Sequence, residues 1–308
     1  MNHRRLTHAP YLWLLTALSI GCADDEAFGI EFVSVHDGQR VGCDVPLESV
    51  GPDGAYTVRI ADLRFYVSDL EFLDDAGEVL PHTFDEGPFQ RPDRWGDVAL
   101  VDLTGTESGT CMQDGITFAE GTPEVDGIVT GTTAIDQVRS VRFSVGVPQA
   151  VMQEVIANYS LEGAPAPLNQ MYWSWASGYR HFVWNFAVDG PEGSGEGYIH
   201  VGSRDCAAPG ANALQGQDRC GFVNTPRVEL DFDPAMDTVE VDLTTLLEGI
   251  DFRAPVYDAS TFEVIGEQTG VECHSAPLQP HCGPVFDALG IDSQGDASVS
   301  SNRVFRVP

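Results

Sequence analysis

Apolar and polar residues alternate along much of this chain with a period of two, a pattern that suits extended strands and not helices. The run from Val138 to Val147 alternates most cleanly, and the longer run from Val58 to Leu73 has room for one long strand or a strand pair. The same alternation returns in three shorter runs, at 228–232, 239–243 and 304–307. The pattern predicts a chain built mainly from β-strands.

Turn-forming and helix-forming residues place these strands in a mainly β, β-sandwich-like single domain with few short helices. The 32 glycines and 19 prolines punctuate the strands. A short helix is expected after Pro148, over 149–159, and helical turns at 244–250 and 285–289. Two glycine-rich or polar stretches are expected to be loops, at 190–197 and 207–218.

The N-terminus has the order of a secretory signal peptide: Arg4 and Arg5, a short apolar run over 11–20, and small residues before Cys22. A cysteine at the cleavage point resembles a bacterial lipoprotein box, in which its thiol is acylated. The alternative is an ordinary signal peptide that leaves Cys22 as a spare thiol. We expect a signal peptide at 1–21, a lipid-anchored linker at 22–30 and the folded domain at 31–308.

The other six cysteines suit three disulfides in an oxidising compartment. The two local pairs that we expect are Cys206–Cys220 and Cys273–Cys282, which leaves Cys43 and Cys111 to pair by subtraction. Disulfides and a signal peptide together predict export to the periplasm or the cell surface, with the lipid as the chain's membrane contact.

Charge and motifs exclude several functions. The net charge is −31 and all 16 basic residues are arginine, so nucleic acid would repel the chain and no lysine can form a Schiff base. The sequence has no nucleophile elbow, phosphate-binding loop, dinucleotide fingerprint or His-Glu-x-x-His motif. We therefore expect a binding protein and not an enzyme.

The most unusual segment is Met171-Tyr172-Trp173-Ser174-Trp175. If it is extended, Met171, Trp173 and Trp175 share one face. An aromatic core strand is one interpretation. A soft metal pocket is the other, because a thioether among aromatic rings suits Cu(I).

Histidines offer the second type of ligand. His200 is expected at a strand end before Cys206, His181 could face the aromatic strand, and His36 precedes a turn. His274 and His281 flank the Cys273–Cys282 pair. A zinc site is conceivable there, but the spacing favours a disulfide-bridged surface loop.

An ordered series of motifs resembles the MbnP-like family, also called metallo-mystery-pair four-Cys-motif proteins. The resemblance covers nearly the whole mature chain and is most specific at the Trp-x-Trp segment. Its motifs are Asp62–Leu70, Val101-Asp102-Leu103, Val145–Pro148, Pro167–Asn169, Met171–Trp175 with Gly178-Tyr179, His200–Ser203 with Cys206, Val285-Phe286 with Leu289-Gly290, and Phe305-Arg306-Val307.

The resemblance implies copper homeostasis outside the cytoplasm, with Cu(I) held by a histidine and a methionine. It also implies a partner, a dihaem MbnH-like enzyme of the cytochrome c peroxidase kind, that oxidises the first Trp of Trp-x-Trp to kynurenine. Carried over to this sequence, the modified residue is Trp173, with Met171 as the sulfur ligand and His200 as the imidazole.

One departure leaves the ligand set open. Many relatives carry Asn-His shortly after Gly-Val-Pro, where this chain has Met152-Gln153. Met152 could then compete with Met171, and His181 or His36 could replace His200. Two other classes of function stay open: a non-metal binding or structural lipoprotein module, and a secreted hydrolase, for which no nucleophile–base pair is evident.

Overall fold

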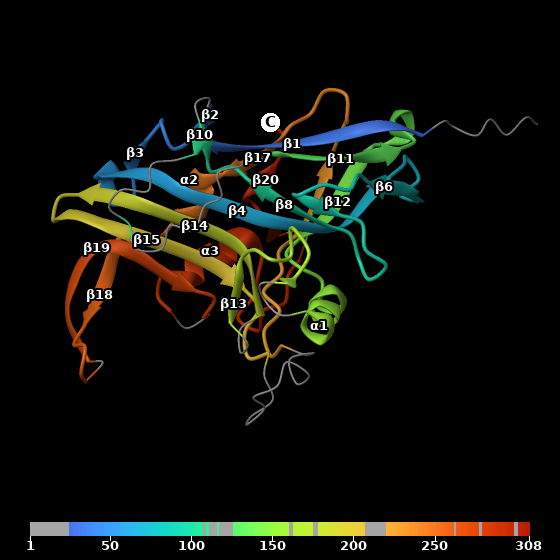
Figure 1. Cartoon of the computed structure of the whole chain (residues 1–308). Coiled ribbons are helices and arrows are strands. Elements are labelled where there is room, and N and C mark those ends of the chain that lie inside the picture. Colours follow the sequence, from blue (N-terminus) through green and yellow to red (C-terminus); the bar gives the residue numbers. More distant parts are fainter. Residues whose placement is uncertain are drawn as a thin grey trace, which may run out of the picture.

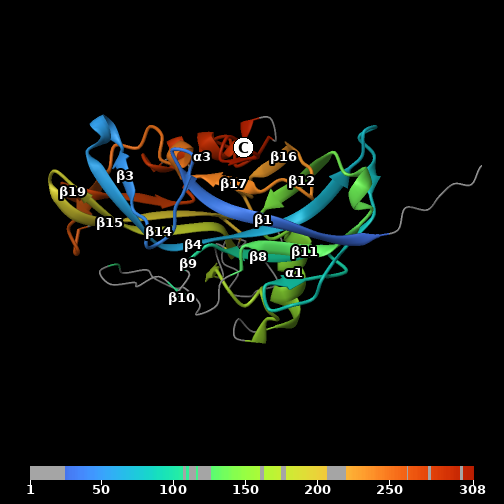
Figure 2. The same cartoon turned by 90° about the horizontal axis from the view of Figure 1, so that it is seen from above.

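The computed structural model describes residues 25–106, 109–110, 116, 126–159, 163–174, 178–206, 220–261, 263–276, 279–298 and 301–308. These residues form two β-sheets packed face to face, so the mainly β, sandwich-like single domain is confirmed. In Figure 1, β1, β11 and β17 lie above the long strand β4, while α1 and β13 lie below it. In Figure 2, seen from above, β1 passes in front of β4.

The larger sheet is built around β4 (Tyr56–Leu73), which realises the long alternating run as one strand. Its seven main strands follow the order β16 (Arg227–Asp231), β12 (Ser140–Val145), β4, β14 (Gly178–Gly190), β15 (Gly193–Gly202), β19 (Val264–His274) and β18 (Arg253–Tyr257). Shorter strands extend it, namely β3 (Leu47–Val50), β5 (Val79–Leu80) and β8 (Val98–Asp102) on β4, β7 (Gln90–Arg91) on β8, and β13 (Tyr172–Ser174) on β14.

The second sheet covers one face of the first. Its strands are β20 (Phe305–Arg306), β17 (Val239–Asp242), β1 (Glu26–His36), β11 (Ile128–Thr133) and β6 (His82–Phe84), with β2 (Gln39–Arg40) beside β1. A separate ribbon pairs β9 (Gly105–Thr106) with β10 (Gly109–Thr110). Among the described strands, two pairs are parallel, β1 with β17 and β15 with β19.

Among the described residues, three α-helices lie close to where the sequence predicts them. α1 (Gln149–Asn158) follows Pro148, and α2 (Leu243–Leu246) is capped by Asp242, whose carboxylate accepts from two backbone amides. α3 (Cys282–Leu289) ends at Gly290 with φ of 73°, a left-handed conformation that glycine adopts without strain. Among the described residues, no helix is long and apolar enough to cross a membrane.

Two apolar clusters lie on opposite faces of the larger sheet. The main core fills the space between the sheets, where Phe32 of β1 meets Phe65 of β4 edge-on at 5.4 Å between ring centroids. The second cluster lies on the far face and includes Tyr66, Val183 and α1 residue Met152. The part of the far face beneath this cluster is therefore also buried, and among the described residues α1 and the segment before β13 cover it.

The folded domain begins earlier than expected, because β1 starts at Glu26 within the stretch 22–30 that the sequence suggested as linker. Phe28 and Ile30 are buried, and residues 26–31 pair with β11. The period-two alternation of these residues fits a strand, so the linker can extend only to residue 25.

The stretch 190–197 is also not a loop. Gly190 pairs with Gly193, so Pro191 and Glu192 form the tip of a β14–β15 hairpin. Its glycines permit close packing within the sheet: a Cβ on Gly197 would lie 2.0 Å from the ring of Phe186. The other expected loop, 207–218, lies outside the described residues.

Both expected local disulfides are confirmed, Cys206–Cys220 and Cys273–Cys282. Cys43 is also disulfide-bonded, and Cys111, the partner expected by subtraction, lies outside the described residues. Cys22 and the signal segment lie outside them as well.

Candidate metal centre

Met171 lies just before β13, on the far face of the larger sheet. Its side chain is 4% exposed and belongs to the second apolar cluster, and its carbonyl oxygen accepts from the Arg180 amide. Its φ is +50°, so the extended run does not reach back to Met171. From the sequence, we expected Met171 and Trp173 to share one face of an extended segment. This expectation is not met, because the backbone at Met171 is not extended. The backbone of Trp173 lies in β13, and its side chain and Trp175 lie outside the described part of the chain.

Buried polar contacts hold the segment before Met171 against the sheet. The Tyr66 hydroxyl lies 2.9 Å from the carbonyl oxygen of Pro167 and 2.8 Å from that of Gln170. The Arg64 guanidinium donates to the Gln170 side chain at 3.1 Å. Met171 thus follows a segment fixed directly against β4, which limits where its sulfur can lie.

His200 occupies the centre of a row of cross-strand neighbours on this face. The register places Arg64 of β4 beside Val183 of β14, Val183 beside His200 of β15, and His200 beside His274 of β19. A second, adjacent row contains Asp62, Asn185, Tyr198 and Glu272. Four strands thus bring polar side chains from distant parts of the sequence to one face.

A buried hydrogen-bond chain orients the His200 ring. Its Nε2 lies 2.7 Å from Oδ1 of Asn185, and the Asn185 amide donates to Asp62. Asp62 in turn forms a 2.6 Å ion pair with Arg64. Because Oδ1 can only accept, Nε2 carries the hydrogen and a neutral His200 has its lone pair on Nδ1. This arrangement, in which the second ring nitrogen donates to an oriented oxygen, is typical of metal-binding histidines.

Electrostatics keep His200 neutral. Burial lowers the pKa of His200 well below its usual range, and the charges of Arg180, His274 and Arg64 lower it further. A neutral imidazole is the form that binds metals, so no proton has to be displaced at neutral pH.

His274 is a residue that the sequence interpretation missed. It was assigned to a surface loop, but it ends β19 with its ring 5.2 Å from that of His200, centroid to centroid. The ring of Tyr198 stacks on it at 6.0 Å, and a Glu272 carboxylate oxygen lies 3.7 Å from its Nε2. Alternation in the sequence could have placed His274 on the far face: Val271 and Cys273 face the core, so Glu272 and His274 face the other way.

His281, the other histidine beside this disulfide, is also not on the surface. It is 5% exposed, its Nδ1 accepts from the Glu272 amide at 2.8 Å, and its Nε2 lies 3.1 Å from Asp251. These contacts give His281 a structural role at the start of α3.

The alternative ligands lie in two places: Met152 and His181 at the larger sheet, and His36 at the other sheet. Met152 is 2% exposed in the same cluster as Met171, and its sulfur would lie 2.8 Å from a Cβ on Gly178, which begins β14. His181 is buried at a bulge in β14, where Nδ1 lies 3.2 Å from the carbonyl oxygen of Asn224, and burial lowers its pKa to about 4. His36 lies apart, at the end of β1 in the other sheet, and contacts Thr244 and Glu48.

The donors on the far face fit a soft monovalent ion. Met152, Met171 and a neutral His200 share this face, and its carboxylate Asp62 is engaged by Arg64. Thioether and imidazole donors suit Cu(I), whereas hard cations prefer oxygen. Among the described residues, no three His, Cys, Asp or Glu side chains converge as a metal site. A site that combines imidazole with thioether needs no such group.

Fold and site together define a disulfide-bonded β-sandwich protein with buried histidine and methionine side chains on one face of the larger sheet. The model of the MbnP family matches residues 25–264, and the chain belongs to the MbnP family. Among solved structures it resembles MbnP from Methylosinus trichosporium with 27% identity and a TM-score of 0.69, over 92% of this chain and 98% of that chain. A comparison with curated protein sequences gave no match.

Proposed function

We propose that this protein binds Cu(I) through the imidazole of His200 and the thioether of Met171, and that it acts in copper homeostasis without catalysing a reaction. The observation that carries the proposal is that a neutral, oriented imidazole and two buried thioethers lie on the same face of one sheet. Met152 lies in the same cluster and is the alternative sulfur ligand.

In the same proposal, a dihaem MbnH-like enzyme converts Trp173 to kynurenine with peroxide as the oxidant. Two peroxide molecules cleave the indole C2–C3 bond, leave two oxygen atoms on the side chain and release two waters, which gives N-formylkynurenine. Water then removes the formyl group as formate. Family membership supports this step, as does the position of Trp173 two residues after Met171. The aniline nitrogen and ketone that result make a polar neighbour for the ion.

The proposal places the mature chain in the periplasm or on the cell surface, attached through a lipid on Cys22. The signal-like segment 1–21 and the disulfides support this location, since disulfides persist in oxidising compartments. The membrane contact is then the lipid alone.

Copper analysis and peptide mass spectrometry test the proposal. The chain is produced with and without its dihaem partner, and copper per chain and the mass of the Trp173 peptide are measured. We expect stoichiometric copper, and with the partner a net gain of one oxygen and loss of one carbon at Trp173.

Matched variants locate the site in the same experiment. His200→Gln should abolish copper binding, whereas His36→Gln, in the other sheet, should leave it unchanged. A chain that binds no copper and keeps Trp173 intact in the presence of the partner would contradict the proposal. Its function would then be that of a non-metal surface module.

A further inference from the structure

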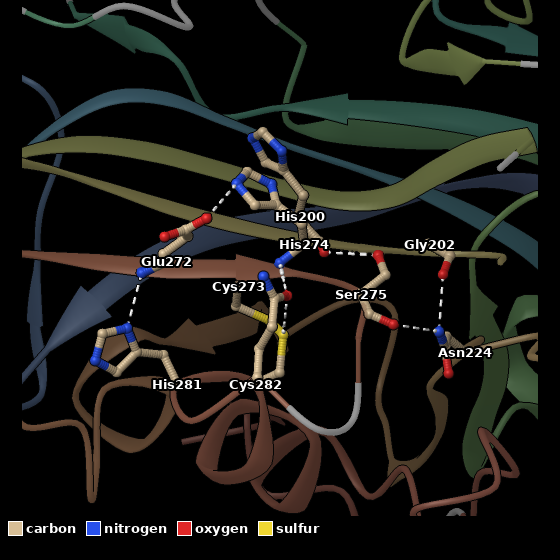
Figure 3. The surroundings of a disulfide bond; sticks show 10 residues. His200, Gly202, Asn224, Glu272, Cys273, His274, Ser275, His281 and Cys282 are labelled. Atoms are coloured by element: carbon tan, nitrogen blue, oxygen red, sulfur yellow. Dashed lines mark hydrogen bonds and ion pairs between the residues drawn. A yellow bond between two sulfur atoms is a disulfide. The ribbon is translucent and has the colours of Figure 1, made fainter. Parts of the chain in front are cut away.

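The two histidines on the far face lie side by side although 74 positions separate them in the sequence. β15 and β19 pair in parallel with His200 opposite His274, and the ring centroids are 5.2 Å apart. Figure 3 shows the two rings next to each other on the same side of these strands. A cross-strand pair on one face is the closest arrangement that a sheet offers to two side chains.

The separation of the rings suits a shared ion. With metal–nitrogen bonds of roughly 2 Å, two imidazoles that bind one ion at a tetrahedral angle have centroids roughly 5 Å apart. The observed 5.2 Å falls at this value, and the interplanar angle of 62° keeps the rings from stacking on each other.

An oxygen acceptor faces Nε2 of each ring. Asn185 Oδ1 lies 2.7 Å from Nε2 of His200, and Glu272 Oε1 lies 3.7 Å from Nε2 of His274. The hydrogen bond to Asn185 puts the hydrogen of His200 on Nε2. The Glu272 carboxylate is too distant for a hydrogen bond, but its charge favours the same tautomer of His274, so the lone pair of each ring lies on Nδ1. The two rings therefore present the same nitrogen as a metal ligand.

The strand that carries His274 is fixed on both sides. Cys273 forms the disulfide with Cys282, the first residue of α3, and the His274 amide donates to Gln279 at 2.8 Å. Tyr198 covers the ring from β15. A ligand held in this way needs little reorganisation when an ion binds.

We propose that His274 is the second imidazole ligand of the Cu(I) site, opposite His200, with Glu272 and Asn185 orienting the two rings. This inference rests on the copper site proposed above and adds a residue to it. His274 lies beyond residue 264, where the match to the family model ends, so this ligand comes from the C-terminal part of the chain.

X-ray absorption of the copper-loaded, partner-treated protein tests the inference without any variant. Two imidazoles give a stronger outer-shell scattering pattern than one, and we expect a fit with two. A fit with a single imidazole would overturn the role of His274 and leave copper binding by His200 intact. A wild-type chain that takes up no Cu(I) would overturn both proposals.

Competition with a chromophoric Cu(I) chelator tests the same point in variants. His274→Gln should weaken Cu(I) binding by more than the roughly 10–100-fold that losing an outer-shell partner costs, and should leave a single imidazole. His281→Gln removes a histidine beside the same disulfide and should bind as the wild type does, with circular dichroism showing that both variants fold. If His274→Gln kept wild-type affinity and scattering while His200→Gln lost copper, His274 would not be a ligand.

Discussion

Asn185 decides which nitrogen of His200 is available. Its side chain is completely buried between His200 and Asp62, accepting from His200 at one end and donating to Asp62 at the other. Asp62 is itself fixed by two 2.6 Å hydrogen bonds from Arg64. The orientation of one imidazole thus depends on a buried ion pair on the strand two places away, because the carboxamide links the two.

Asn185→Leu keeps the approximate volume of the side chain and removes both contacts. We expect Cu(I) affinity to fall by roughly 10–100-fold, the usual effect of losing the oxygen that orients a histidine ligand. Chelator competition measures the affinity, and urea unfolding measures the accompanying loss of stability, about 1–3 kcal/mol for an unsatisfied buried group.

Thr133→Val is the control, because it removes a buried hydrogen bond to Pro81 in the other sheet. It should lower stability and leave copper affinity unchanged. If both variants lost stability and neither lost affinity, Asn185 would act only in folding.

At the scale of elements, β1 packs the second sheet onto the inner face of the larger sheet. It pairs with β11, β17 and β2, and its inward residues Phe28, Ile30 and Phe32 enter the main core. Without these residues, part of the inner face of the larger sheet would be exposed to water. The N-terminal half of β1 is therefore part of the fold although it lies close to the expected anchor.

A chain that begins at residue 31 should be much less stable than one that begins at residue 25. Removing Phe28 and Ile30 exposes two buried side chains, each contributing roughly 1.5–3 kcal/mol, so the loss is about 3–6 kcal/mol. Urea unfolding of the two disulfide-bonded chains measures it. Equal unfolding midpoints would show that Glu26–Ile30 is dispensable and behaves as a linker.

At the scale of the whole molecule, the sequence predicts where strands lie better than it predicts which strands pair. Alternation identified β4 and β12, because the face of each that packs on the main core carries apolar side chains and the other face carries more polar ones. The disulfides Cys206–Cys220 and Cys273–Cys282 were predictable because each closes a short loop. The glycines of 193–197 led to the wrong prediction of a loop, since close strand packing and loops both favour glycine.

The pairing of His200 with His274 had no local signal. It depends on the parallel register of β15 and β19, and the chain between these strands passes through β16, β17 and β18. Nothing in the residues beside His274 specifies that route. His200 and Met171 could be named beforehand from the family resemblance, whereas His274 required the topology.

The net charge of −31 makes ionic strength a test of the folded state as a whole. Like charges repel most strongly in the compact state, so screening should stabilise it. Raising NaCl from about 10 mM to about 150 mM shortens the Debye length from about 30 Å to about 8 Å. We expect the free energy of unfolding at pH 7 to rise over this range, measured by urea unfolding of the copper-free chain. The control is the same series near pH 4.2, the isoelectric point, where repulsion is balanced and the rise should vanish. If the free energy at pH 7 fell with salt, the ion pairs of the 16 arginines would outweigh the repulsion among the 47 acidic residues.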